Sequence, residues 1–322
     1  MGLEALILLV SLTVLAFSAY YMVGSGVRIA RHFKLSEALI GLTLIAWGTS
    51  SPEIAVSVTA ALNGQGDLSV GNVIGSNIFN LGFILGLVAL VKSQPIAKKM
   101  VYRDGFVLLG SSLLILLFVW DFKITFFEGF ILLLMLVAYS AYLFMVKDVE
   151  TADESPKTPD LSGKYDKFKD IFIFAASLAI LMKSSDYTVL SATNIARSFG
   201  VSDWAIGATI IAAGTSLPEA ATSITATIKG KYGMALGNVI GSDIFNALGI
   251  IGISSVLREI HLKGQHEVFG VPDFMFSQLM LIATVLLILV FMRTKWRLGR
   301  VEGGILLSIA LARMIFEIYV GS

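Results

Sequence analysis

The stretch that decides the fold is GLTLIAWGTSSPEIAVSVTAALNGQGDLSVGNVIGSNIFN, which runs from Gly41 to Asn80. A near copy, GATIIAAGTSLPEAATSITATIKGKYGMALGNVIGSDIFN, runs from Gly207 to Asn246. The two align without a gap at a constant offset of 166 residues, from Gly41 to Gly207. Both place Pro, Glu, hydroxyl and Asn side chains inside apolar sequence, where polar groups are costly. The repeat therefore predicts a duplicated fold and the position of a functional site.

The composition of the chain places these repeats in a membrane. Its mean hydropathy is +0.82, with 56% hydrophobic and only 15% charged residues, so the chain must be solvated by lipid. It has no cysteine, which excludes disulfides and thiolate metal sites. Apolar segments of about 20 residues, the length that spans a bilayer, occur ten times. They are Leu3–Val23, Glu37–Leu62, Leu68–Val91, Gly105–Trp120, Phe126–Val146, Ile171–Ser191, Trp204–Ile228, Met234–Leu257, Phe274–Met292 and Gly303–Val320.

The basic residues predict the orientation of the chain. When the loops are assigned alternately to the two sides, 18 of the 24 Lys and Arg fall on one side. Loops rich in Lys and Arg stay in the cytoplasm. We therefore expect a multi-pass protein of the cell membrane with both termini outside the cell.

The chain is predicted to consist of two halves, residues 1–147 and 170–322. The polar stretch between them, 148–169, contains Pro156 and Pro159 and is typical of a flexible cytoplasmic linker. Five helices per half is an odd number, so the second half enters the membrane from the opposite side. We predict an all-α integral membrane fold of ten transmembrane helices, arranged as two inverted-topology five-helix repeats.

The first repeated motif is GTSSPE at 48–53 and GTSLPE at 214–219. Pro52 and Pro218 cannot donate the helical hydrogen bond to Gly48 and Gly214, so each helix is expected to break there and free carbonyl oxygens. The next half-helix then starts with a Glu in its first turn, where the helix dipole favours a carboxylate. Such backbone is tolerated in a bilayer only where it lines a polar cavity.

The second repeated motif is GNVIGSNIFN at 71–80 and GNVIGSDIFN at 237–246. It begins as GxxxG, which favours close helix packing. Asn72, Ser76 and Asn80 recur every four residues and share one helical face, as do their copies 166 residues later. This polar stripe is expected to face the broken helices rather than lipid.

The two motifs together supply only oxygen ligands, and two of the side chains are carboxylates. A flexible oxygen shell of this kind suits Ca²⁺ and Na⁺ and is a poor site for soft metals. Two carboxylates brought together would repel each other unless a cation or protons lay between them. The sequence therefore predicts a site for a hard cation.

The paired blocks resemble the two alpha-repeats of the cation/calcium exchanger superfamily, and GTSxPE in both copies is similar to its sodium/calcium exchanger branch. The resemblance covers the ten-helix plan and implies that Glu53 and Glu219 bind Ca²⁺ at the membrane midplane. It implies further Ca²⁺ and Na⁺ ligands at the matching flanking positions, which are Thr49, Ser50, Ser76, Asn80, Thr215, Ser216, Ser242 and Asn246.

One position departs from the pattern of this family. Many relatives have Asp where this chain has Asn246, so one negative charge is missing. Asp243, about 60° away on the same helix, either replaces that charge or points elsewhere. We include it among the candidate metal ligands.

The resemblance implies a secondary active antiporter that exchanges Ca²⁺ for Na⁺ by alternating access to a midplane site. With two site carboxylates, H⁺ is an alternative counter-ion, which would make the protein a proton/calcium exchanger. A passive cation channel is an alternative of another class. We expect no enzymatic activity, no cofactor, no nucleic acid and no obligate protein partner, so the partners are the transported ions and the lipid bilayer.

Overall fold

The computed structural model describes residues 2–146, 166–201, 206–264 and 267–320, and they form helices joined by short turns. Helices lie at every predicted segment, apart from Trp204 and the residue after it, which are outside these ranges. Of the predicted linker, 148–169, the residues up to 165 also lie outside these ranges. The first half contains α1 (Gly2–Phe33), α2 (Glu37–Ile40), η1 (Gly41–Ile45), α3 (Ala46–Thr49), α4 (Ser51–Leu62), α5 (Gly66–Phe79), η2 (Asn80–Ile84), α6 (Leu85–Val91), η3 (Met100–Gly105), α7 (Phe106–Phe118), η4 (Val119–Asp121) and α8 (Phe126–Val146).

The second half follows a similar order of elements, although its described residues include no counterpart of α2 or η3. It contains α9 (Lys167–Ser198), η5 (Gly207–Ile211), α11 (Ala212–Gly214), α12 (Leu217–Ile228), α13 (Tyr232–Phe245), η6 (Asn246–Ile250), α14 (Ile251–Leu257), α15 (Asp273–Arg293), η7 (Thr294–Trp296) and α16 (Arg300–Val320). Among the described residues, strands are limited to two-residue pieces: β1 (Gln94–Pro95), β2 (Lys123–Ile124), β3 (Ile260–His261), β4 (Glu267–Val268), β5 (Val271–Pro272) and β6 (Arg297–Leu298).

Among the described residues, six continuous helical stretches are long and apolar enough to cross a membrane. A seventh is the pair Glu37–Thr49 and Ser51–Leu62, which is bent by 50° at Ser50. The remaining predicted segments, including α9 and α16, are not among these stretches. The expected total of ten spans therefore remains a prediction.

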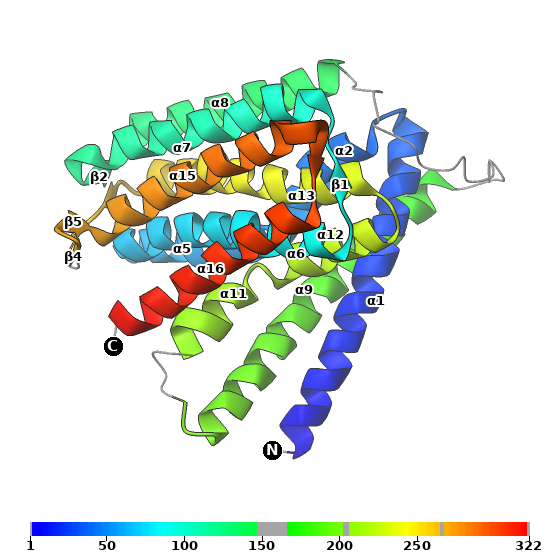
Figure 1. Ribbon diagram of the computed structural model, residues 1–322, viewed down its shortest axis with the longest axis horizontal. Coiled ribbons are helices and arrows are strands. Elements are labelled where there is room, and N and C mark those ends of the chain that lie inside the picture. The colour runs from blue at the N-terminus through cyan, green and yellow to red at the C-terminus, as the bar shows by residue number, and fades with distance from the viewer. Residues whose placement is uncertain (1, 147–165, 202–205, 265–266, 321–322) are drawn as a thin grey trace.

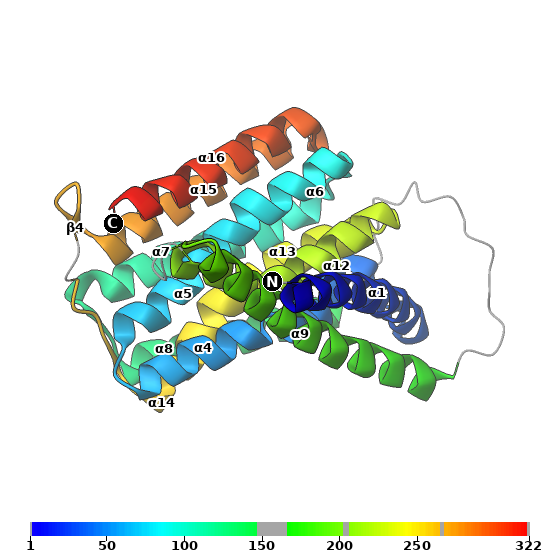
Figure 2. The ribbon, with the colours of Figure 1, turned by 90° about the horizontal axis from the view of Figure 1, so that it is seen from below.

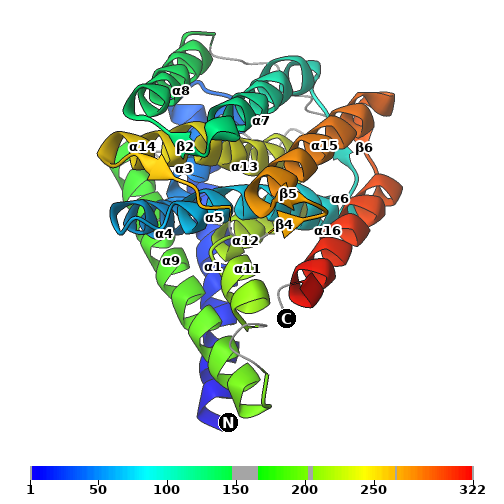
Figure 3. The ribbon, with the colours of Figure 1, turned by 90° about the vertical axis from the view of Figure 1, so that its left-hand side faces the viewer.

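The centre of the molecule is formed by two continuous helical stretches, Gly66–Val91 and Tyr232–Leu257. They are the most buried of the apolar helices, at 72% and 89% of their most apolar window. α5 and α13 lie one above the other in the middle of the molecule (Figure 3). Each stretch contains a π-helical turn, and these turns begin at Asn80 and Asn246. A π-turn inserts an extra residue into a helix and often marks a functional site.

The two longest helices, α1 and α9, lie side by side and extend away from α7 and α8 (Figure 1). Arg28 of α1 donates to Asp170 of α9 at 2.5 Å, and His32 lies 3.0 Å from the other oxygen of the same carboxylate. At the opposite end, Asn194 of α9 donates to Glu4 of α1 at 3.1 Å. Polar contacts thus hold both ends of the α1/α9 pair together.

The short strands pair across the two halves. β1 pairs with β6, and β2 pairs with β3, both in antiparallel register. Each half therefore gives one strand to each of these two-stranded sheets. These two small sheets connect loops of the first half to loops of the second.

Candidate functional site

Both GTSxPE motifs break their helices, as the prolines predict. The helix of the first copy is interrupted at Ser50 (φ −78°, ψ 10°), and that of the second at Ser216 (φ −90°, ψ 8°). Pro52 and Pro218 lie in the first turn of the half-helices that follow, where a missing N–H costs nothing. Glu53 and Glu219 lie in the same first turns and are completely buried.

Each buried carboxylate is bound by the serine at the break of the other repeat. Ser216 Oγ donates to Glu53 Oε1 at 3.2 Å, and Ser50 Oγ donates to Glu219 Oε1 at 3.1 Å. These bonds place the two breaks face to face. The structure therefore brings together the residues that the sequence predicts at the centre of the site.

The other oxygen of each of these carboxylates, Oε2, is buried without a hydrogen-bond partner. Several predicted ligands share this property. They are Thr215 Oγ1, Ser242 Oγ, Asp243 Oδ2, Asn80 Oδ1 and Asn246 Oδ1. A buried polar atom without a partner is costly. A cation bound among these oxygens would remove that cost.

The charged groups of the site are few. Within the described ranges, no three His, Cys, Asp or Glu side chains are grouped so that they could hold one metal ion. An ion at this site would therefore depend on neutral oxygens beside the Glu53 and Glu219 carboxylates. Hard cations such as Ca²⁺ and Na⁺ accept such mixed oxygen shells.

Asp243 belongs to a buried network of amides. Asn80 Nδ2 donates to Asp243 Oδ1 at 2.9 Å, and Asn77 Nδ2 donates to the Asp243 carbonyl at 3.1 Å. Asn246 Nδ2 donates to Asn77 Oδ1 at 3.0 Å. All four side chains are fully buried. Asp243 therefore contacts a predicted ligand directly and does not point away from the site.

Asn77 was missed in the sequence analysis, although a signal was present. It occupies the position in the first repeat that Asp243 occupies in the second. A residue that is the counterpart of a candidate ligand should itself be a candidate. In the structure it links Asp243 to Asn246.

The remaining asparagines of the polar stripe brace the broken helices. Asn72 Nδ2 donates to Ser57 Oγ of α4, and Asn238 Nδ2 donates to Ser223 Oγ of α12, both at 2.9 Å. Thr49 Oγ1 donates to Asn238 Oδ1 at 3.3 Å. The stripe thus faces the broken helices as expected, while these two amides hold the half-helices in position.

The carbonyl oxygens freed by the prolines are partly used by the protein itself. Ser51 Oγ donates to the Gly48 carbonyl at 2.7 Å, and Ser185 Oγ of α9 donates to the Gly214 carbonyl at 3.3 Å. Serine hydroxyls thus donate to these two carbonyls in place of the N–H that proline lacks.

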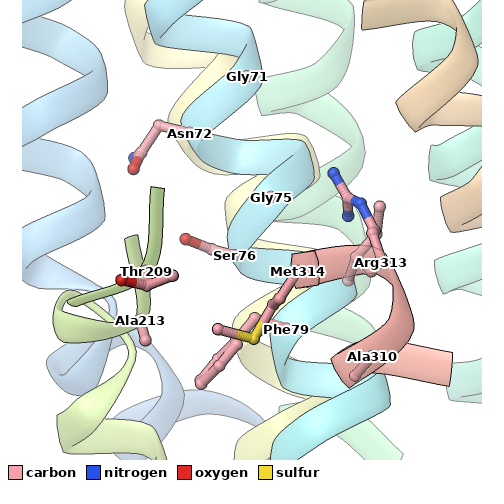
Figure 4. Close-up of a pocket in the computed structure, with 11 residues that line it drawn as sticks. Gly71, Asn72, Gly75, Ser76, Phe79, Thr209, Ala213, Ala310, Arg313 and Met314 are labelled. Carbon is pink, nitrogen blue, oxygen red and sulfur yellow. The ribbon is translucent and has the colours of Figure 1, made fainter. Parts of the chain in front are cut away.

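A cavity of about 110 Å³ lies beside the site, between α5, η5, α11 and α16 (Figure 4). Ser76 lines it from α5, and Thr209 and Arg313 line it from η5 and α16. Gly71 and Gly75 also border it. The cavity is large enough to hold water and borders one predicted ligand, Ser76.

The glycines of the two GxxxG copies lie in different surroundings. A methyl group added at Gly237 or Gly241 would lie 2.6 Å or 2.5 Å from a backbone carbonyl of α2 or η1. At Gly71 and Gly75, no atom of the described residues lies within 4 Å of such a group. The prediction that GxxxG packs closely is therefore correct for the second copy. It is wrong for the first copy, whose glycines border the cavity.

Comparison with known proteins identifies the family. The sequence profile described as "Sodium/calcium exchanger protein" matches residues 3–145 and 169–319. The putative antiporter CaxA of Alkalimonas amylolytica is 38% identical, over 93% of both chains. The sodium/calcium exchanger MaX1 of Methanosarcina acetivorans is 31% identical, over 98% of both chains. These relatives match the whole plan of the chain and not only its repeats.

The fold is also that of a solved exchanger. The structure of the sodium-calcium exchanger NCX_Mj, soaked with 2.5 mM Na⁺ and 0.1 mM Ca²⁺, matches with a TM-score of 0.82 at 27% identity. The match covers 97% of this chain and 98% of that chain. The form soaked without Na⁺ or Ca²⁺ matches equally closely, with a TM-score of 0.81.

Proposed function

Because the chain belongs to the sodium/calcium exchanger family, we propose that it is a secondary active antiporter that exchanges Ca²⁺ for Na⁺ across the cell membrane. The ions are its substrates and the bilayer is its surroundings. Both termini lie outside the cell in this proposal, which follows the distribution of Lys and Arg.

The observation that carries the proposal is the set of buried oxygens without hydrogen-bond partners. Oε2 of Glu53 and Oε2 of Glu219 belong to this set, together with oxygens of the surrounding Ser, Thr, Asn and Asp side chains. Nitrogen and sulfur ligands are missing from it among the described residues. The ion that suits this set is a hard cation, and the carboxylates of Glu53 and Glu219 together balance the charge of one Ca²⁺.

Alternating access explains how one site can serve both sides of the membrane. In this proposal the two halves have inverted topology, so exchanging their conformations turns an outward opening into an inward one. The cavity at Ser76 supports an opening on one face. The glycines of the other copy are packed against backbone, which supports closure on the opposite face.

Exchange also requires that the empty transporter does not switch freely. Without an ion, the buried carboxylates of Glu53 and Glu219 face each other across the reciprocal serine bonds and repel. Occluding two uncompensated charges is costly. Either one Ca²⁺ or several Na⁺ would neutralise them and permit the transition, so the fluxes of the two ions are coupled. Protons would neutralise the same carboxylates, which keeps a proton/calcium exchanger as the second candidate.

The test is uptake of ⁴⁵Ca²⁺ into liposomes that contain the purified protein. An outward Na⁺ gradient should drive uptake by the wild type, whereas Glu53→Gln and Glu219→Gln should reduce it at least a hundredfold. Asp186→Asn is the matched control, because Asp186 is an exposed acidic residue of α9 paired with Lys183. Its uptake should equal that of the wild type.

The driving force separates the candidate functions. Uptake driven by a pH gradient and unaffected by Na⁺ would replace the proposal with proton/calcium exchange. Flux that needs no counter-ion gradient and appears as unitary currents would indicate a channel. Undiminished uptake by either glutamine variant would refute the assignment of the site.

A further inference from the structure

One face of α9 carries an ion pair that points out of the molecule. Lys183 Nζ lies 3.3 Å from Asp186 Oδ2, and the two side chains are 77% and 64% exposed. Both residues belong to the predicted span Ile171–Ser191. α9 lies along the edge of the molecule, with α1 beside it (Figure 2). In the proposed membrane arrangement, this ion pair therefore faces lipid within the span.

The other faces of α9 are already in contact with the protein. Thr188 Oγ1 donates to Ser11 Oγ of α1 at 2.9 Å. Ser185 Oγ donates to the Gly214 carbonyl of α11 at 3.3 Å. The exposed side chains on the remaining face include a row with about one residue per turn, formed by Ala175, Ala179, Lys183 and Asp186. We call these four residues the α9 stripe.

The ion pair is incomplete within one chain. An ammonium group has three N–H donors, and a carboxylate has two acceptor oxygens. Among the described residues, Lys183 and Asp186 bind only each other. Lipid offers no hydrogen-bond partners, and a charged group exposed to lipid is costly. A partner that brings a second cation and a second anion would lower this cost.

The equivalent helix of the first half, α1, shows what a lipid-facing row contains in this fold. The residues 166 positions before the α9 stripe are Leu9, Thr13, Phe17 and Tyr20. The three large side chains are 67%, 62% and 54% exposed, as expected for contact with lipid. The α9 stripe has small and charged residues at the same positions. Small residues four apart are typical of helix–helix interfaces in membranes, so the α9 stripe differs from α1 as an interface would.

We propose that the α9 stripe binds a second copy of this chain, with the two α9 helices parallel about a two-fold axis along the membrane normal. The stripe carries one cation and one anion, so it is complementary to itself, as a two-fold interface requires. Lys183 of each chain donates to Asp186 of the other, across an offset of about 4.5 Å along the helix. Ala175 and Ala179 allow the two backbones to approach closely. The four charges then form a closed ring of alternating sign.

Self-association is separate from ion exchange. Glu53, Glu219 and the serines that bind them belong to one chain, so each copy keeps a whole site. Neither charge of the α9 stripe is repeated in α1, whereas both glutamates occupy equivalent positions in the two halves. Uptake of ⁴⁵Ca²⁺ per chain should therefore be the same for the variants below as for the wild type, and this uptake also shows that they are folded.

Disulfide crosslinking in liposomes tests the interface, because the chain has no cysteine of its own. Ala179→Cys places one thiol in the α9 stripe, where it lies opposite its own copy in a two-fold dimer. Thr13→Cys, at the equivalent exposed position of α1, is the matched control. At a low protein-to-lipid ratio, a mild oxidant should link most of the Ala179→Cys protein into dimers and leave Thr13→Cys monomeric.

Charge reversal tests whether the ion pair holds the two copies together. In the Ala179→Cys protein, Lys183→Glu or Asp186→Lys places like charges opposite each other and should lower the yield of crosslinked dimer about tenfold. A mixture of these two variants restores unlike charges across the interface and should recover the yield as mixed dimers. If a charge-reversed chain fails to enter the membrane, Ala175→Leu takes its place. It keeps both charges, gives α9 the residue that α1 has at this position, and should lower the yield similarly.

The outcomes decide between a specific dimer and random contact. Preferential crosslinking of Ala179→Cys, its loss in the single variants and its recovery in the mixture support the proposal. Equal crosslinking of Thr13→Cys would overturn it, as would a yield that neither charge reversal nor Ala175→Leu lowers, or a mixture that stays monomeric. The crosslinking yield does not depend on which ions the protein exchanges, so this proposal and the proposed function can fail separately.

Discussion

Asn80 donates its side-chain amide to the carboxylate of Asp243 across 2.9 Å. This bond joins the π-turn of one repeat to α13 of the other. Asp243 Oδ2 and Asn80 Oδ1 are both buried without a partner. The fold thus places a third carboxylate against a predicted ligand, at a position where the first repeat has a neutral amide.

Replacing Asp243 with Asn removes this charge with little change in shape. We expect the KM for Ca²⁺ to rise about tenfold, equivalent to about 1.4 kcal/mol, because Ca²⁺ loses a nearby negative charge. Initial rates of Na⁺-driven ⁴⁵Ca²⁺ uptake measure the change. The double variant Asp243→Asn with Asn77→Asp should recover part of the loss, since residues 77 and 243 are repeat counterparts. An unchanged KM accompanied by a lower melting temperature would make Asp243 a purely structural residue.

The reciprocal serine bonds predict equal roles for Ser50 and Ser216. Each donates to the glutamate of the other repeat at nearly the same distance. A hydrogen bond to a charged group contributes about 1.5–3 kcal/mol. Ser50→Ala and Ser216→Ala should therefore weaken Ca²⁺ binding at least tenfold and to a similar extent. Calcium-dependent thermal stabilisation reports the affinity, and a large loss in only one variant would contradict the two-fold arrangement.

The asparagine braces predict a loss of stability rather than a direct loss of ion binding. Asn72→Ala leaves Ser57 Oγ without the donor that now bonds to it at 2.9 Å. Such a change costs about 1–3 kcal/mol. Unfolding in detergent should show this loss for Asn72→Ala and for Ser57→Ala. The double variant should cost less than the two single changes together, because they remove the same bond, and strict additivity would refute the brace.

The two GxxxG copies predict opposite responses to the same substitution. Gly241→Ala forces a methyl group against the Leu42 carbonyl and should destabilise the protein by about 1–3 kcal/mol. Gly75→Ala meets no atom of the part of the chain that the structure describes and should leave the melting temperature unchanged or slightly raised, since Ala favours helix more than Gly does. Thermal unfolding of both variants in the same detergent provides the comparison. Equal destabilisation would show that both copies are packed alike.

Much of the site could be predicted because the repeat occurs twice at one fixed offset. The prolines located the breaks at Ser50 and Ser216, since proline cannot donate the helical hydrogen bond. The burial of Glu53 and Glu219 followed from their place within apolar sequence. These features depend on local chemistry, which the sequence carries directly.

The features that could not be predicted depend on which helices of the two halves pack against each other. Asn77 and Asp243 are counterparts, yet only the fold shows that Asn77 bonds to the Asp243 carbonyl. The Gly48 carbonyl is satisfied by Ser51, while the Gly214 carbonyl needs Ser185 from another helix, because residue 217 is a leucine. The two repeats have nearly the same sequence but different surroundings, and the sequence alone does not show which surroundings each repeat has.

The unequal packing of the two glycine pairs has a consequence for turnover. If the halves trade conformations in each cycle, Gly71 and Gly75 must enter the tight contact that Gly237 and Gly241 now occupy, while the latter pair is released. The two pairs of glycines then mark two helix contacts, of which one closes while the other opens. A side chain at Gly71 or Gly75 would then block the conformation in which these glycines are packed, so the protein would fold and bind an ion but could not release it on the other side.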